Sequence, residues 1–88
     1  MKLKYRFVIR EMAEQYVAVA VGADNAHFHG MVKLNSTGAF LMERLNEKPC
    51  TEEELLHAML DRYDVTRERA RENLQSFLQI LRDGDLLI

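Results

Sequence analysis

The sequence predicts an α+β fold: a three-stranded antiparallel β-meander followed by three helices, in a winged-helix-like arrangement. Over residues 5–34 apolar side chains alternate with polar ones as in strands, and from residue 35 onward they recur with a period of about 3.6. The connections between the strand-like runs are short, which favours an antiparallel meander. The apolar face of so small a sheet needs a covering layer, and the helices that follow supply it.

Composition indicates one globular domain spanning residues 1–88. A chain of 88 residues has interior for a single core, and 48% hydrophobic with 30% charged residues is the balance of a folded protein. The net charge of −2 argues against a protein that binds by neutralising phosphates, so no nucleic-acid partner is expected. The chain has one cysteine and lacks a long apolar run, so we expect a cytoplasmic protein without a membrane partner.

Three strands are expected in the first third of the chain. The first begins near Tyr5 and stops near residues 11–14, and the second covers the apolar run at residues 16–21. The third, over residues 26–34, is apolar on one side only. Its apolar face carries Phe28, Gly30, Val32 and Leu34, and its other face carries His27, His29, Met31 and Lys33. The first and third strands are then the two edges of the sheet.

Capping residues mark the starts of the three helices. Asn35 or Ser36 caps a helix that ends near residue 46, and residues 51–54 form a capping box that opens a second helix to about residue 63. Thr66 caps the third helix, which runs to about residue 82 and is closed by Gly84. Residues 86–88 form an apolar tail that packs back onto the core. The residues predicted to share one core are Phe28, Val32, Leu41, Leu45, Leu60, Leu74, Phe77 and Leu81.

Catalytic and metal-binding residues do not form a recognisable set in the sequence. His27 and His29 lie two residues apart on one strand face, but a zinc site needs three or four protein ligands and no third is nearby. Cys50 precedes a helix whose first turn carries three glutamates, which oppose a reactive thiolate, so we expect an inert loop thiol. The expectation is a protein that is not an enzyme and that needs neither cofactor nor metal.

A DNA-binding winged helix is the alternative interpretation. Arg67, Arg69 and Arg71 lie on the long last helix, where such a module would contact DNA. Glu68 and Glu72 are interleaved with them, whereas a phosphate-binding helix needs an uninterrupted positive face. The open edge of the third strand is the other candidate surface, because an unpaired strand edge is either protected or used for binding.

Residues 34–45 read Leu-Asn-Ser-Thr-Gly-Ala-Phe-Leu-Met-Glu-Arg-Leu, which resembles the L-N-x-[ST]-[GA]…[LI]-[WL]-E-x-L signature of the PqqD-like family. Residues 51–55, 63–65 and 70–88 follow the order and spacing of the same family, so the resemblance covers about residues 28–88. Three positions depart from the family pattern: Met42, Asn73 and the residue inserted between Gly84 and Leu86. None of the three is expected to touch the edge of the third strand.

The resemblance implies a peptide-recognition module, also called a RiPP recognition element. Such a module binds the leader of a ribosomally made precursor peptide and presents its core to a modifying enzyme, frequently a radical SAM enzyme. We expect the leader to add as a strand along the third strand, beside the last helix. The same edge could alternatively pair two copies into a homodimer. The residues predicted to bind the peptide are His27, Phe28, His29, Gly30, Met31, Val32 and Lys33 on the strand, and Arg71, Leu74, Gln75, Leu78 and Arg82 on the helix.

Overall fold

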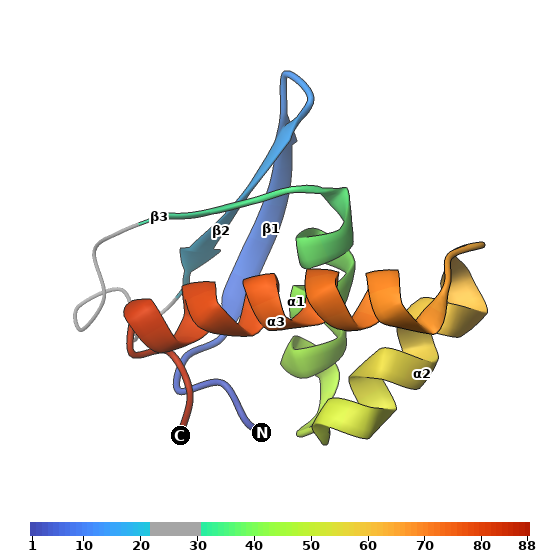
Figure 1. Ribbon diagram of the computed structural model, residues 1–88. Helices are drawn as coiled ribbons and strands as arrows, with labels where there is room; N and C mark the ends of the chain where they lie inside the picture. Colours follow the sequence, from blue (N-terminus) through green and yellow to red (C-terminus); the bar gives the residue numbers. More distant parts are fainter. Residues whose placement is uncertain (22–30) are drawn as a thin grey trace.

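The sheet has three antiparallel strands in the order β1-β2-β3, which confirms the predicted α+β fold (Figure 1). The structure is a computed structural model that describes residues 1–21 and 31–88. The strands are β1 (Phe7–Met12), β2 (Gln15–Ala20) and β3 (Met31–Leu34). β1 and β3 are the two edges, as expected, and residues 26–30 of the predicted third strand lie outside the described part.

A two-residue turn joins β1 to β2. Met12 pairs with Gln15, and the two residues between them, Ala13 and Glu14, have φ angles of 46° and 69°. Positive φ at both central positions is the geometry that matches the twist of a hairpin, and glycine or asparagine usually supplies it. The hairpin forms without either residue, because strand pairing on both sides imposes the turn.

Three helices follow: α1 (Ser36–Glu47), α2 (Glu52–Arg62) and α3 (Arg67–Asp83). Asn35 caps α1, since its Oδ1 accepts a hydrogen bond of 2.7 Å from the Gly38 N–H. Thr66 caps α3 in the same way through the Arg69 N–H. The predicted helices are thus confirmed to within a residue or two at each end.

The capping box of α2 is complete. The Glu54 N–H donates to Thr51 Oγ1 at 3.1 Å, and the Thr51 N–H donates to Glu54 Oε1 at 2.9 Å. The backbone hydrogen bond from Thr51 is the main reason that the pKa of the Glu54 carboxyl lies below its ordinary value. The charged form of Glu54 therefore helps to fix the point at which the chain enters α2.

The C-terminal end of α3 differs from the prediction in one respect. Gly84 follows the helix but keeps a helical conformation, and Asp85 is the residue with positive φ, at 53°. The Asp85 N–H donates to the Arg82 carbonyl at 3.0 Å and the Leu86 N–H to the Leu81 carbonyl at 2.9 Å. These two bonds form a Schellman motif. They turn the tail so that Leu86 is buried against the core, as predicted.

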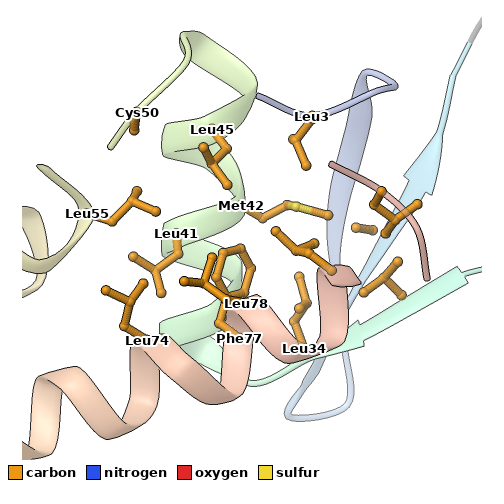
Figure 2. Close-up of a cluster of buried hydrophobic side chains, with 14 of the residues drawn as sticks. Leu3, Leu34, Leu41, Met42, Leu45, Cys50, Leu55, Leu74, Phe77 and Leu78 are labelled. Carbon is orange, nitrogen blue, oxygen red and sulfur yellow. The ribbon is translucent and has the colours of Figure 1, made fainter. Parts of the chain in front are cut away.

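Helix α1 lies at the centre of the molecule and contacts each of the other described strands and helices. Figure 2 shows Leu74, Phe77 and Leu78 of α3 pointing inward toward Leu41 and Met42 of α1. Of the predicted core, Leu60 is only half-buried and Phe28 lies outside the described residues. The other predicted members are buried: Val32, Leu41, Leu45, Leu74, Phe77 and Leu81.

The two ends of the chain lie side by side beneath the sheet (Figure 1). The Lys4 N–H donates to the Leu86 carbonyl and the Ile88 N–H to the Lys2 carbonyl, each at 2.8 Å. Leu3 and Leu87 form the isolated antiparallel bridge between these bonds. In residues 1–21 and 31–88, no helix is long and apolar enough to cross a membrane.

Truncation of the α3 core should unfold a domain of this size. Leu74 is 1% exposed, and Leu74→Ala is expected to lower the free energy of unfolding by about 2–5 kcal/mol, because it removes buried methyl groups and leaves a cavity. Glu72→Ala, at an exposed position two residues away, should change it by less than about 0.5 kcal/mol. Urea denaturation measures both. Equal effects of the two substitutions would show that the inward face of α3 is assigned incorrectly.

Candidate functional site

One hydrogen bond at the end of β2 shows to which side each backbone N–H and C=O of the sheet points. The Val21 N–H donates to the Arg6 carbonyl at 3.1 Å, so the backbone polar groups of Val21 point toward β1. In an antiparallel sheet, the N–H and C=O of successive residues point to opposite sides of the strand. The odd-numbered residues of β2 therefore direct their polar groups to β1, and the even-numbered residues direct theirs to β3.

The outer edge of β3 consequently presents the N–H and C=O groups of Met31 and Lys33. The even-numbered residues of β2 pair with Val32 and Leu34, which directs the polar groups of those two residues inward. The side chains alternate as well: Val32 and Leu34 are 7% and 6% exposed, whereas Met31 is 64% exposed and Lys33 is exposed. No other described strand lies beyond β3. The edge can therefore accept a further strand.

The opposite edge of the sheet is closed at its start. Asn46, near the end of α1, accepts a hydrogen bond of 3.1 Å from the Phe7 N–H and donates one of 2.7 Å to the Phe7 carbonyl. Its side-chain amide thus takes the place of a neighbouring strand residue at β1. Ile9 and Glu11 also direct their backbone groups outward, so Asn46 closes β1 at Phe7 only. The two edges of the sheet therefore differ at the start of β1.

A groove lies between β3 and α3 beside this open edge. A hollow of about 140 Å³ is lined by Leu34, Asn35 and Gly38 on one side and by four residues of α3 on the other. The α3 residues are Asn73, Ser76, Phe77 and Ile80. They are spaced i, i+3, i+4 and i+7, so they share one face of the helix. Phe77 is buried, whereas Ile80 remains 40% exposed.

The peptide-binding residues predicted on α3 do not line this groove. Leu74 and Leu78 are 1% and 0% exposed in the core, so they offer no surface to a ligand in this structure. Gln75 donates a hydrogen bond of 2.7 Å to Glu52 of α2. Arg71 and Arg82 share its side of the helix, by the same spacing rule. The structure thus places this predicted set in the core or on the α2 side of α3, away from the groove.

The residues predicted on the strand are only partly described. His27, Phe28, His29 and Gly30 lie outside the described residues. Met31 and Lys33 are at the open edge, and Val32 lies between them with its side chain turned into the core.

Sequence reasoning missed Asn73, Ser76 and Ile80 on the groove and Asn46 on β1. The apolar stripe of α3 has two polar rims, and nothing in the residue spacing tells which rim faces β3. Ile80 on one rim is a weak signal, because single apolar residues are common on protein surfaces. Asn73, one of the departures from the family pattern, lines the hollow with Leu34.

Other hollows lie away from β3. One of about 410 Å³ is lined by Ile9 and Glu11 of β1, among other residues. Another, about 490 Å³, lies between α1 and α2 and has no strand residue in its lining. Cys50 is buried, with its Sγ 3.4 Å from the Lys48 carbonyl oxygen. Within residues 1–21 and 31–88, no group of three or more histidine, cysteine, aspartate or glutamate side chains is placed to hold a metal. The β3 edge is the candidate site, because its outward backbone groups lie next to a hollow against α3.

Comparison with protein families supplies the identification. The family model described as coenzyme PQQ synthesis protein D (PqqD) matches residues 24–87, which include β3 and all three helices. The chain belongs to the PqqD family. Comparison with curated proteins finds no match.

Among solved structures, this PqqD-family chain is similar to TbiB1 in complex with the TbiA(beta) leader peptide. The TM-score is 0.70 at 23% sequence identity, and the similarity covers 99% of this chain and 94% of that chain. The two proteins therefore share the fold over almost their whole lengths.

Loss of the hydrogen bonds between Asn46 and Phe7 should lower the free energy of unfolding. Asn46→Asp keeps an acceptor for the Phe7 N–H but removes the donor to the Phe7 carbonyl and places a carboxylate beside that oxygen. We expect a loss of about 1–3 kcal/mol in the free energy of unfolding, against less than about 0.5 kcal/mol for Glu47→Gln at the neighbouring exposed position. Denaturation curves that coincide for Asn46→Asp and the unmodified protein would contradict this role of Asn46.

Proposed function

We propose that this PqqD-family protein binds the leader of a ribosomally made precursor peptide as a fourth strand on β3 and presents the core of that peptide to a modifying enzyme. The observation that carries the proposal is the pair Met31 and Lys33, whose backbone groups face outward on the open edge of β3 beside the groove. The complex of the structurally similar TbiB1 with a leader peptide supports it. The protein acts in this scheme by binding and not by catalysis.

Backbone pairing alone gives little net affinity. Met31 and Lys33 offer four hydrogen-bonding groups in the described part of β3, each with a net contribution of about 0.5–1.5 kcal/mol. Ordering of a disordered peptide opposes binding by about 2–5 kcal/mol. The hydrogen bonds thus set the register of the added strand, and side chains that enter the groove must supply most of the remaining affinity.

The modifying enzyme is the proposed second partner. A radical SAM enzyme is the class that the family resemblance favours, and a precursor made on ribosomes would be met in the cytoplasm. A DNA-binding role finds no support in α3, because Arg67 and Arg71 share the exposed surface with Glu68 and Glu72.

The direct experiment is a titration of the isotope-labelled protein with the leader of the precursor encoded beside it, followed by backbone amide shifts. The amides of Met31 and Lys33 and those of the groove residues of α3 should shift. Shifts confined to the hollow between α1 and α2, with β3 silent, would refute strand addition. A change in molecular mass without peptide would reveal a homodimer on the same edge.

Lys33→Pro tests the backbone contribution. Proline removes only the outward N–H of β3 and is tolerated at such edge positions, so the fold should persist while the ring blocks the added strand. We expect leader affinity to fall at least tenfold, which is about 1.4 kcal/mol. Lys33→Ala keeps the N–H and should lose less than about fivefold, the range of one exposed charge pair. Equal affinities of the two variants would exclude pairing at Lys33.

A further inference from the structure

The groove wall on α3 includes a charged residue beyond the hollow. Arg69 precedes Asn73 by one helical turn, and Arg69, Asn73, Ser76 and Ile80 are spaced i, i+4, i+7 and i+11, so all four lie on one face. Arg69 is exposed, and no described residue forms an ion pair with its side chain. The wall of the groove therefore ends in a guanidinium free to bind a carboxylate.

The outer face of β3, turned away from the helices, carries a second cation. Lys33 is exposed on β3 and also has no ion-pair partner among the described residues. None of the four residues on the groove face of α3 is acidic, although the whole chain has a net charge of −2. Arg69 and Lys33 are thus two exposed cations that an added strand would pass, one on each of its faces, although Glu72 lies three positions after Arg69 on α3. Each cation complements an acidic side chain of a bound peptide.

The hollow between the walls suits one aliphatic side chain. Its volume is about 140 Å³, and Asn35, Asn73 and Ser76 give it a partly polar lining. Leu34, Phe77 and Ile80 supply apolar contacts. Gly38 has no side chain to fill the hollow, and a Cβ at this position would lie 3.2 Å from Leu34 Cδ2, closer than an ordinary contact. A leucine or isoleucine side chain that enters the hollow would contact these three apolar residues.

The register of an added strand places its side chains relative to these features. Peptide residues opposite Leu34 and Val32 point toward the helices, as those two residues do, and the residue between them lies on the outer face beside Lys33. β3 and α3 run in opposite directions in Figure 1, and β3 leads to the start of α1. A peptide that continues past Leu34 is therefore carried toward the N-terminal half of α3, where Arg69 lies.

We propose that the groove selects leader segments in which an aliphatic side chain fills the hollow beside Ile80 and acidic side chains flank it, one next to Lys33 and one next to Arg69. This inference rests on the proposed function and deepens it. Arg69 is in this scheme a specificity residue, whereas Arg71, two positions along the same helix, faces α2 and takes no part.

The test is a selection that needs no known ligand. A phage library of random 12-residue peptides is selected on the immobilised protein, and the consensus peptide is synthesised with a fluorophore for anisotropy titration. The enriched sequences should share an aliphatic residue with aspartate or glutamate on both sides. Selection on Ile80→Gln, altered at a partly exposed position, should lose the aliphatic preference while the acidic residues persist.

Arg69→Glu and Arg71→Glu form a matched pair with the same change of charge on the same helix. Arg69→Glu should weaken binding of the consensus peptide at least fivefold, and a peptide with lysine in place of the acidic residue at the α1 end should recover the lost affinity. Arg71→Glu should stay within twofold of the unmodified protein. The difference should shrink as salt is raised, because exposed charge pairs are screened.

The possible failures separate the two proposals. Enriched peptides without acidic residues, or equal losses for Arg69→Glu and Arg71→Glu, would overturn the charge selection. Binding at β3 would stand in that case if Lys33→Pro still weakens it at least tenfold. A library that yields no binding peptide, or only peptides insensitive to Lys33→Pro, would overturn strand addition and the inference together.

Discussion

The position of α1 is the constraint on which the rest of the structure depends. Leu41 and Met42 are fully buried, and α1 contacts all the other described elements. A three-stranded sheet cannot bury its apolar face alone, so α1 covers it, and α2 and α3 then pack on α1. Because α3 packs on α2 and α1 and has little contact with the strands, a groove remains between α3 and β3. The groove is therefore a consequence of how the core is filled.

The same helix makes the two sheet edges unequal. Near its C-terminal end α1 supplies Asn46, whose amide binds both polar groups of Phe7 and closes the start of β1. At its N-terminal end it continues from β3 through Asn35, which caps the helix and lines the groove. One helix thus protects one edge and shapes the surface beside the other. An open edge is an aggregation hazard unless something occupies it, which is a physical reason to expect a peptide partner at β3.

Local sequence patterns predicted the helices and strands well. They predicted poorly how these elements pack against one another. The capping residues Asn35, Thr51 and Thr66 and the inward stripe of α3 could be assigned because each depends on neighbours within a few positions. The rim of α3 that faces β3 could not be assigned from the sequence, since this depends on how α3 crosses α1. The Asn46 contact with Phe7 joins residues 39 positions apart, and asparagine at a helix end has many other uses. The open strand edge was predicted correctly, but its α3 wall was not.

Hydrogen exchange of individual amides tests the central claim most directly. In the free protein the N–H groups of Val32 and Leu34 are paired with β2 and should exchange slowly, whereas those of Met31 and Lys33 face solvent and should exchange fast. Addition of the leader of the precursor encoded beside the protein should slow exchange at Met31 and Lys33 and leave Val32 and Leu34 nearly unchanged. Unchanged fast exchange at Met31 and Lys33 with saturating bound peptide would contradict strand addition on β3.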